Sequence, residues 1–170
     1  MVRQLVTTIV FIFAVASVAH PQNDDPFKRV KLISDFVEHG LGISLAVSDA
    51  NIRNLGRVKK VTVEQYEDRG IVMEKRTYYI DGLQVVANFG KGKDSGGGIT
   101  EAVVTGPKWK IYKGLCVGAS IDTVVKTLGE PTSKKSEKTY EYCGETGVDC
   151  ATFEISKNKV VKITFTYYWD

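Results

Sequence analysis

The sequence predicts an α+β protein built from two tandem units, each with short helices packed on an antiparallel β-meander. Three observations predict this class. A helix-like segment ending in glycine occurs twice, strand-like segments rich in β-branched and aromatic residues follow each copy, and a longer amphipathic helix precedes both. We place the amphipathic helix and the first unit at residues 20–107, and the second unit at residues 108–170.

Residues 1–19 have the pattern of a secretory signal peptide. Arg3 precedes an apolar run over residues 5–18, and Ser17 and Ala19 offer the small residues that a signal peptidase recognises. The run is too short for a comfortable transmembrane span, so none is expected after cleavage. We therefore expect a secreted or periplasmic protein, cleaved near Ala19. An uncleaved N-terminal anchor is the alternative.

An amphipathic helix is expected soon after this leader. Asp25 is a capping candidate, and Pro26 suits the first helical turn. Apolar residues then recur at spacings of three and four until Gly40, namely Phe27, Val30, Ile33 and Val37. We expect this stripe to pack on a sheet, because the acidic residues and modest length disfavour a membrane-surface or partner-binding helix.

Two shorter helices correspond to each other when Gly56 is laid on Gly129. Each copy carries a cation in its last turn and ends at glycine. The capping candidates are Ser48 or Asp49 in the first copy and Ser120 or Asp122 in the second. Chance similarity between amphipathic elements is the alternative reading, because two copies fall short of an unmistakable array.

Strand-like segments follow each of these helices. In the first unit they cover residues 61–63, 73–80, 83–89 and 99–104; in the second they cover residues 139–142, the surroundings of Phe153, and residues 160–165. Asp81-Gly82 predicts a tight hairpin turn. The glycine-rich stretch over residues 90–98 is expected to be a flexible loop.

The cysteines predict one disulfide. Cys143 and Cys150 flank a turn-like segment between two strands, so a bridge across the mouth of that hairpin is expected in an exported protein. Cys116 is then left over. It is either a buried small hydrophobic residue or a reactive or intermolecular thiol.

Composition and motifs disfavour nucleic acid, metal and cofactor binding. The net charge is only +3, and acidic residues interrupt cationic stretches such as Arg57-Val58-Lys59-Lys60, which we interpret as solvated faces. No zinc or calcium-loop spacing occurs, and no cofactor is expected. No catalytic residues are predicted. His39 lies in the last turn of the expected first helix, where a cation interacts favourably with the exposed carbonyl groups, so a capping role is the simpler explanation for it.

Aromatic residues are the candidate binding residues. Amphipathic rings on an open sheet face bury much area for little side-chain entropy, and they are typical of protein-binding surfaces. The candidates are Tyr78, Trp109, Tyr140, Tyr142, Tyr167 and Trp169. The alternative for each ring is a place in the core or in a cross-strand pair.

A family resemblance rests chiefly on the second unit. Its residues are 113–120, Val124-Val125, 128–131, 140–142, 153–155, 158–161 and Ile163. This pattern resembles a unit of the β-lactamase-inhibitor-protein-like superfamily, which also contains the small BamE/SmpA outer-membrane assembly lipoproteins. The tandem arrangement is similar to that of the inhibitor.

The resemblance implies a helical layer against a curved antiparallel sheet in each unit. It also implies that the two sheets form a concave, aromatic-rich surface that clasps a protein. Two departures are visible. No lipoprotein cysteine follows the leader, and Arg57-Val58 replaces the Gly-x-Pro stop that stands at Gly129. No inhibitory contact residue carries over.

The sequence therefore predicts an exported, non-enzymatic protein-binding module with an unidentified protein partner, in one form an inhibitor of an extracytoplasmic enzyme. A cell-envelope assembly factor of the BamE/SmpA type is one alternative. A small thiol-dependent enzyme using Cys116 with His39 is another.

Overall fold

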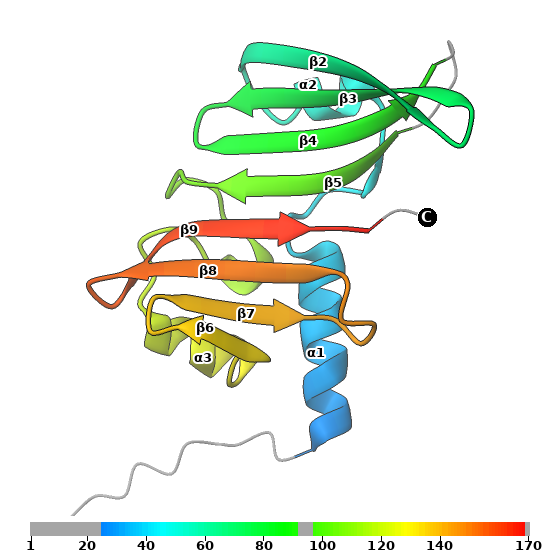
Figure 1. Cartoon of the computed structure of the whole chain (residues 1–170). Coiled ribbons are helices and arrows are strands. Elements are labelled where there is room, and N and C mark those ends of the chain that lie inside the picture. The colour runs from blue at the N-terminus through cyan, green and yellow to red at the C-terminus, as the bar shows by residue number, and fades with distance from the viewer. Residues whose placement is uncertain (1–24, 92–96, 169–170) are drawn as a thin grey trace, which may run out of the picture.

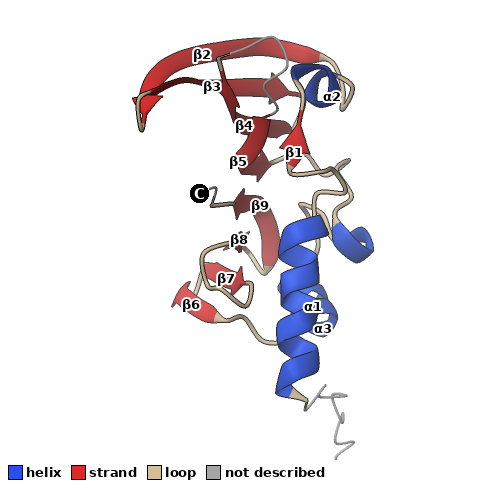
Figure 2. Ribbon diagram, turned by 90° about the vertical axis from the view of Figure 1, so that its right-hand side faces the viewer, coloured by secondary structure: helices blue, strands red, loops and turns tan. Residues whose placement is uncertain are grey.

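In the computed structural model, which describes residues 25–91 and 97–168, nine antiparallel strands form one sheet, and three helices lie on one of its faces (Figures 1 and 2). The elements are α1 (Pro26–His39), β1 (Ala46–Val47), α2 (Asp49–Arg53), β2 (Val58–Asp68), β3 (Ile71–Ile80), β4 (Leu83–Gly90), β5 (Gly97–Val104), the 3₁₀ turn η1 (Tyr112–Gly114), α3 (Ile121–Leu128), β6 (Ser133–Ser136), β7 (Thr139–Cys143), β8 (Cys150–Ser156) and β9 (Lys159–Thr166). The predicted α+β class is confirmed. The predicted signal peptide lies outside the described residues.

The strand order is β2-β3-β4-β5-β9-β8-β7-β6, and β1 pairs with β5. Each run of four consecutive strands is a meander preceded by a short helix. The two meanders join where β5 pairs antiparallel with β9, through Ala102 opposite Phe165. The resemblance implies two sheets, but the described strands form one continuous sheet, because the last strand of each meander pairs with the last strand of the other.

The helices begin and end near the residues that the sequence predicts. Asp25 accepts from the backbone N–H of Phe27 over 3.0 Å at the start of α1. Ser48 caps α2 and Ser120 caps α3, each through its hydroxyl. Gly129 directly follows α3. Within the described part of the chain, no helix is long and apolar enough to cross a membrane.

One cross-strand row shows how the core spans both meanders. Residues directly opposite each other on neighbouring antiparallel strands share a face. Such a row runs from β2 to β7 through Val61, Tyr78, Val85, Ala102, Phe165, Ala151 and Tyr142. From Tyr78 to Tyr142 every member is buried. A single hydrophobic core therefore lies between this face and the helices.

Helix α1 packs on the C-terminal meander, although it precedes the N-terminal one in sequence. Phe36 is fully buried and lies 5.9 Å, between ring centroids, from Phe153 and 5.5 Å from Phe165. Arg29 donates to the carbonyl oxygen of Glu130 over 2.6 Å, which ties the start of α1 to the end of α3. The N-terminal segment at residues 25–39 thus covers strands of the second predicted unit.

The predicted disulfide is present. Cys143 and Cys150 lie directly opposite each other on β7 and β8, with 4.1 Å between their Cα atoms and a sulfur–sulfur distance of 2.08 Å. The glycine-rich stretch differs in part from the expectation, since Gly90 ends β4 and Gly97 begins β5. Residues 92–96 of that predicted loop lie outside the described residues.

Candidate functional site

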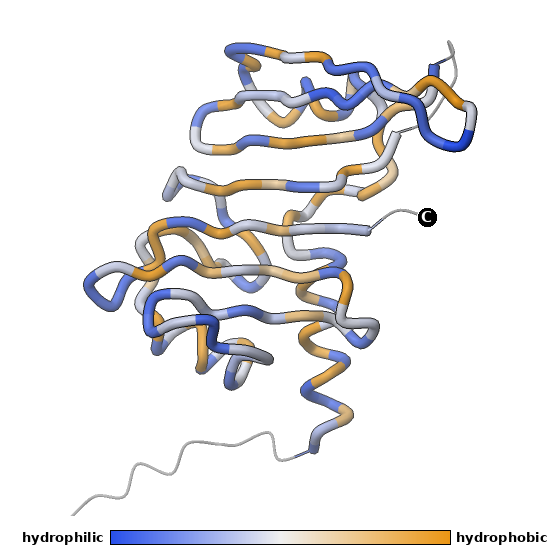
Figure 3. The backbone as a smooth tube through the Cα atoms, in the orientation of Figure 1, coloured by the Kyte–Doolittle hydropathy of each residue, from blue (hydrophilic) through white to orange (hydrophobic). Residues whose placement is uncertain are grey.

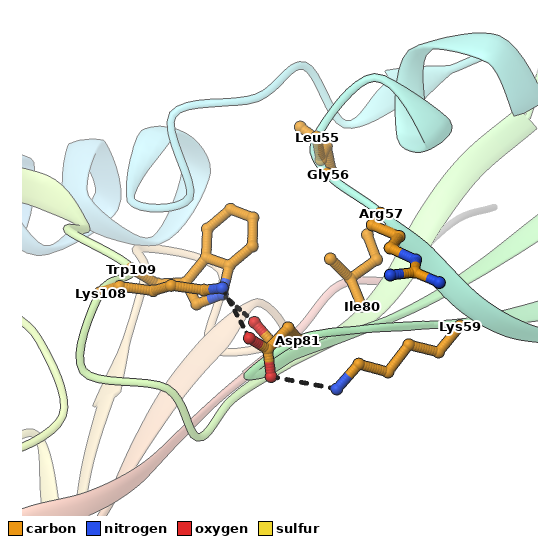
Figure 4. Close-up of a pocket in the computed structure, with 8 residues that line it drawn as sticks. All are labelled: Leu55, Gly56, Arg57, Lys59, Ile80, Asp81, Lys108 and Trp109. Atoms are coloured by element: carbon orange, nitrogen blue, oxygen red, sulfur yellow. Dashed lines mark hydrogen bonds and ion pairs between the residues drawn. The ribbon is translucent and has the colours of Figure 1, made fainter.

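A pocket of about 470 Å³ opens beside the turn that joins β3 to β4 (Figure 4). Three segments line it: the residues leading from α2 into β2, the β3–β4 turn, and the segment after β5. Its lining residues are Leu55, Gly56, Arg57, Lys59, Ile80, Asp81, Lys108 and Trp109. Trp109 is the member of the predicted aromatic set that lies in this pocket.

Two glycines let the segment after β5 lie directly on the β3–β4 turn. Gly82 has φ 74°, and a Cβ there would lie 2.5 Å from the Cα of Gly106. The backbone N–H groups of Thr105 and Gly106 both donate to the carbonyl oxygen of Gly82 over 2.9 Å. The indole Nε1 of Trp109 donates to the carbonyl oxygen of Asp81 over 2.9 Å. The ring is therefore held in place as one wall of the pocket.

Asp81 bridges two lysines at the pocket mouth. Its Oδ2 lies 2.8 Å from Lys108 Nζ, and its Oδ1 lies 3.2 Å from Lys59 Nζ. The ammonium groups, that of Lys108 first, hold the pKa of Asp81 below its usual range. Arg57 lies across the pocket from the indole (Figure 4), so the lining carries three cations and one carboxylate. This excess of positive charge favours an anionic group on the ligand.

The lining combines apolar surface with charged groups. Leu55, Ile80 and the face of the Trp109 ring supply apolar contact, and the cations surround it. None of the lining residues is a serine, cysteine or histidine, so the pocket holds no such nucleophile and no imidazole base. An apolar side chain flanked by a carboxylate is the group that this arrangement accommodates best.

Three of the tyrosines expected on a binding surface lie in the core instead. Tyr78 and Tyr142 are fully buried, and Tyr167 is 6% exposed. Burial, followed by the hydrogen bond to Asp49, raises the pKa of Tyr78 to about 12. Burial likewise raises the pKa values of Tyr142 and Tyr167. The prediction fails because strand alternation groups rings on one face without saying which face the helices cover.

The remaining members of the aromatic set have different surroundings. Tyr140 is partly buried at the margin of the core, and Lys134 Nζ lies 5.0 Å from its ring centroid. Trp109 packs partly against the same core and lines the pocket. Trp169 lies outside the described residues. The predicted residues are therefore not brought together as one surface.

One cross-strand row on the helix-free face of the sheet is mainly polar. The row next to the buried one runs from β2 to β7 through Lys60, Tyr79, Gln84, Val103, Thr164, Thr152 and Glu141. Tyr79 is its one ring, and it is 36% exposed. Along this row the open face carries mainly threonine, charged and amide side chains, with Val103 and Tyr79 among them.

Sequence reasoning missed the pocket's charged residues. It interpreted Arg57 and Lys59 as part of a solvated cationic stretch and Asp81 as part of a turn. Lys108 carried no signal of its own. Nothing local in the sequence relates these positions to Trp109, because the pocket forms only when the segment after β5 folds back onto the β3–β4 turn.

Cys116 and His39 have separate partners. Lys110 Nζ donates to Cys116 Sγ over 3.3 Å, and the thiol is partly buried. His39 Nδ1 lies 3.4 Å from a carboxylate oxygen of Asp35 on its own helix. Among the described residues, the His, Cys, Asp and Glu group closest to metal-ligand spacing is Glu141 with Cys143 and Cys150, and the disulfide engages both of its sulfurs.

Comparison with known proteins adds no relative. A scan against protein-family models and searches of curated proteins and of solved structures found no match to this chain.

Proposed function

We propose that this chain is an exported, non-enzymatic protein-binding module that holds its partner at the Trp109 pocket. The observation that carries the proposal is an indole fixed by a backbone hydrogen bond, with apolar neighbours and an excess of cations around it. Rigid aromatic side chains in desolvated pockets, surrounded by polar groups, supply most of the free energy in protein–protein interfaces. An acidic and apolar segment of a partner fits this pattern.

Two features support an extracytoplasmic location. Residues 1–19 have the composition of a signal peptide. The Cys143–Cys150 bridge is compatible with an oxidising compartment, where disulfides persist.

The repeated order of elements supports two tandem units. A helix followed by four antiparallel strands occurs twice, and both units place a buried tyrosine one strand from the sheet edge. If the chain consists of two such units, the pocket is lined by residues 55–57, 59, 80 and 81 of the first unit and by Lys108 and Trp109 at the start of the second. If the partner is an extracytoplasmic enzyme, inhibition follows where the captured segment borders its active site.

Capture would proceed by burial of a partner side chain against Trp109, followed by ion pairing at the rim. Burying one large apolar side chain contributes about 2 kcal/mol. An exposed ion pair adds less than about 1 kcal/mol and is weakened by salt. Arg57 is the rim cation best placed to add such a pair, because Lys59 and Lys108 already share Asp81.

Affinity capture from the native extracytoplasmic extract tests the proposal, with the mature chain immobilised. Truncation of the indole in Trp109→Ala should weaken capture of the partner about 30-fold, the effect of removing a central anchor worth about 2 kcal/mol. Arg57→Glu should weaken it as well, more strongly at low salt than at high salt. Its matched control is Lys157→Glu, which reverses an exposed cation in the β8–β9 turn.

Two outcomes would contradict the proposal. One is capture that survives both pocket variants; the other is the absence of any protein captured by the unmodified chain. Because Arg57 is exposed, its variant keeps the test valid if Trp109→Ala perturbs folding. Circular dichroism of each variant separates loss of the site from loss of the fold.

A further inference from the structure

The two edges of the sheet differ in length and protection. Edge strand β6 has four residues, Ser133–Ser136, and two of them are lysines, which is a common protection against edge-to-edge pairing. The opposite edge, β2, has eleven residues. Among the described strands it pairs only with β3, so its outer side presents backbone donors and acceptors (Figure 1). Figure 3 shows hydrophilic residues along β6 and hydrophobic ones recurring on the β2–β3 hairpin.

Exposed apolar side chains accompany the unpaired edge. Val63 on β2 is 53% exposed, and Tyr66 on the same strand is also exposed. Ile71 and Val72, just across the hairpin turn, are exposed as well. Apolar side chains on a long, unpaired edge strand are typical of a strand that pairs with another chain.

The charges of β2 are polarised along the strand. Lys59 and Lys60 lie near its start, whereas Glu64, Glu67 and Asp68 lie toward its end. A second strand of this sequence that runs antiparallel meets each half with the opposite sign. A strand that runs parallel in the same register meets it with the same sign, and like charges directly opposite each other are destabilising.

We propose that β2 pairs antiparallel with β2 of a second copy of this chain, around a two-fold axis at Thr62. The sheets of the two copies then continue into each other, with all helices on the same face. The interface is isologous, as in most homodimers. This inference goes beyond the proposed function and does not depend on the Trp109 pocket.

The side chains on the two faces of β2 favour this register. Val61 pairs with buried Tyr78, so Val61 and Val63 share the helix face, while Lys60, Thr62 and Glu64 share the free face. With Thr62 on the axis, Val61 of each copy lies opposite Val63 of the other, and Lys60 lies opposite Glu64. Apolar residues meet on one face and opposite charges meet on the other, each pair occurring twice.

Neighbouring registers lose this match. A shift that puts Val63 on the axis places Lys60 opposite Tyr66, Thr62 opposite Glu64 and Val61 opposite Gln65. The Lys60–Glu64 and Val61–Val63 pairs are then lost, and the one opposite-charge pair left, Lys59 with Glu67, falls at the irregular start of β2. A shift that puts the axis between Thr62 and Val63 places residues of opposite faces against each other, which a regular antiparallel sheet does not allow. Within one copy, and among the described residues, the ion pair of Glu64 is a 3.9 Å contact with Lys75, and its side chain is 73% exposed, so its carboxylate is available.

Sedimentation velocity of the mature full chain over a range of concentrations tests the proposal. We expect a concentration-dependent dimer. Lys60→Glu and Glu64→Lys should each raise the dimer dissociation constant at least about tenfold, because each substitution puts two like-charged pairs in the interface. An equimolar mixture of the two variants should form a heterodimer, since the carboxylate introduced at position 60 faces the lysine introduced at position 64.

The double variant carrying both substitutions should dimerise like the unmodified chain. A chain that stays monomeric at every concentration would overturn the inference. So would a dimer that neither single variant weakens, or single variants whose mixture stays monomeric. Trp109→Ala should leave the dimer unchanged, so that failure of the pocket and failure of the edge pairing are separately visible.

Discussion

The two halves of the sheet differ in the polar contacts that their buried tyrosines make with the helical layer. Each half has a buried tyrosine in the second strand from its edge, and both tyrosines lie in the same cross-strand row. The hydroxyl of Tyr78 donates to Asp49 of α2 over 2.6 Å, whereas the hydroxyl of Tyr142 donates to the backbone carbonyl oxygen of Gly129 over 3.0 Å. Equivalent rings therefore meet a charged acceptor in one half and a neutral acceptor in the other.

The residues around the two helix contacts differ in the same way, charged in the N-terminal half and aromatic in the C-terminal half. In the N-terminal half, Asp49 also accepts from Arg53 over 2.6 Å and lies 3.3 Å from Arg76, which in turn bonds Glu74. In the C-terminal half, Phe36 of α1 packs among aromatic rings. Both halves have buried apolar side chains, but the Asp49 cluster adds to the first half a charged contribution, which pH and salt alter.

The largest expected effect comes from removing the ring at the centre of the C-terminal half. Phe36→Ala should lower the free energy of unfolding by about 3–5 kcal/mol, because it deletes a fully buried ring and leaves a cavity. Chemical denaturation measures this change. Phe27→Ala on the same helix is the matched control, since Phe27 is 85% exposed and its loss should change stability by less than about 0.5 kcal/mol. Equal effects would contradict the packing of α1 on this half.

The next effect concerns the covalent link of the C-terminal half. Replacing both Cys143 and Cys150 with serine should lower the free energy of unfolding by about 2 kcal/mol, because the short loop between them then gains freedom in the unfolded chain. Thermal and urea denaturation under non-reducing conditions measure it. Cys116→Ser is the control and should change stability less. Insensitivity of the unmodified chain to reductant would argue that the bridge contributes no stability.

Much of the fold is local enough to be predicted from sequence. The limits of α1 follow from Asp25 and Gly40, the β3–β4 turn from Asp81-Gly82, and the disulfide from two cysteines across one hairpin. The joining of the meanders through β5 and β9 was not predicted, nor was the packing of α1 on the second half. These features depend on contacts between residues far apart in sequence, which periodicity does not report.

The candidate site also depends on contacts between residues far apart in sequence. Trp109 was singled out as an aromatic anchor, but the residues that make its pocket come from three separated segments. The prediction that Tyr78, Tyr142 and Tyr167 lie on an exposed face was wrong for a related reason. Alternation correctly separates the two faces of a strand, yet only the position of the helices decides which face is buried.

The third prediction compares the two tyrosine hydroxyls directly. Tyr78→Phe should lower the free energy of unfolding by about 1.5 kcal/mol and Tyr142→Phe by about 1 kcal/mol, because hydrogen bonds to charged acceptors contribute more than those to neutral ones. Both substitutions keep the buried ring, so packing is matched. Urea denaturation of the two variants at neutral pH gives the comparison. A larger loss for Tyr142→Phe would reverse the proposed difference between the halves.

The smallest expected effect is the pH dependence of the stability that Asp49, the acceptor of the Tyr78 hydrogen bond, contributes. Burial tends to raise the pKa of Asp49, but hydrogen bonds from Arg53 and Tyr78 and the nearby Arg76 charge lower it below the ordinary value of 3.8. A carboxyl group with a lowered pKa in the folded state stabilises the fold above its unfolded pKa, and this contribution is lost as the pH falls below 3.8 through the folded value. The stability difference between the unmodified chain and Asp49→Asn should therefore shrink in that acid window.

Tyr142→Phe provides the internal reference for this measurement, because the Gly129 carbonyl that accepts its hydrogen bond does not titrate. The cost of that substitution should stay constant while the cost of Asp49→Asn falls. Parallel urea denaturation at pH 6 and at successive steps below 3.8 gives both values. If the two costs change together, acid weakens the sheet as a whole. If only the Asp49 cost changes, the Asp49 cluster gives the N-terminal half a pH-dependent contribution that the Tyr142 hydrogen bond does not give the C-terminal half.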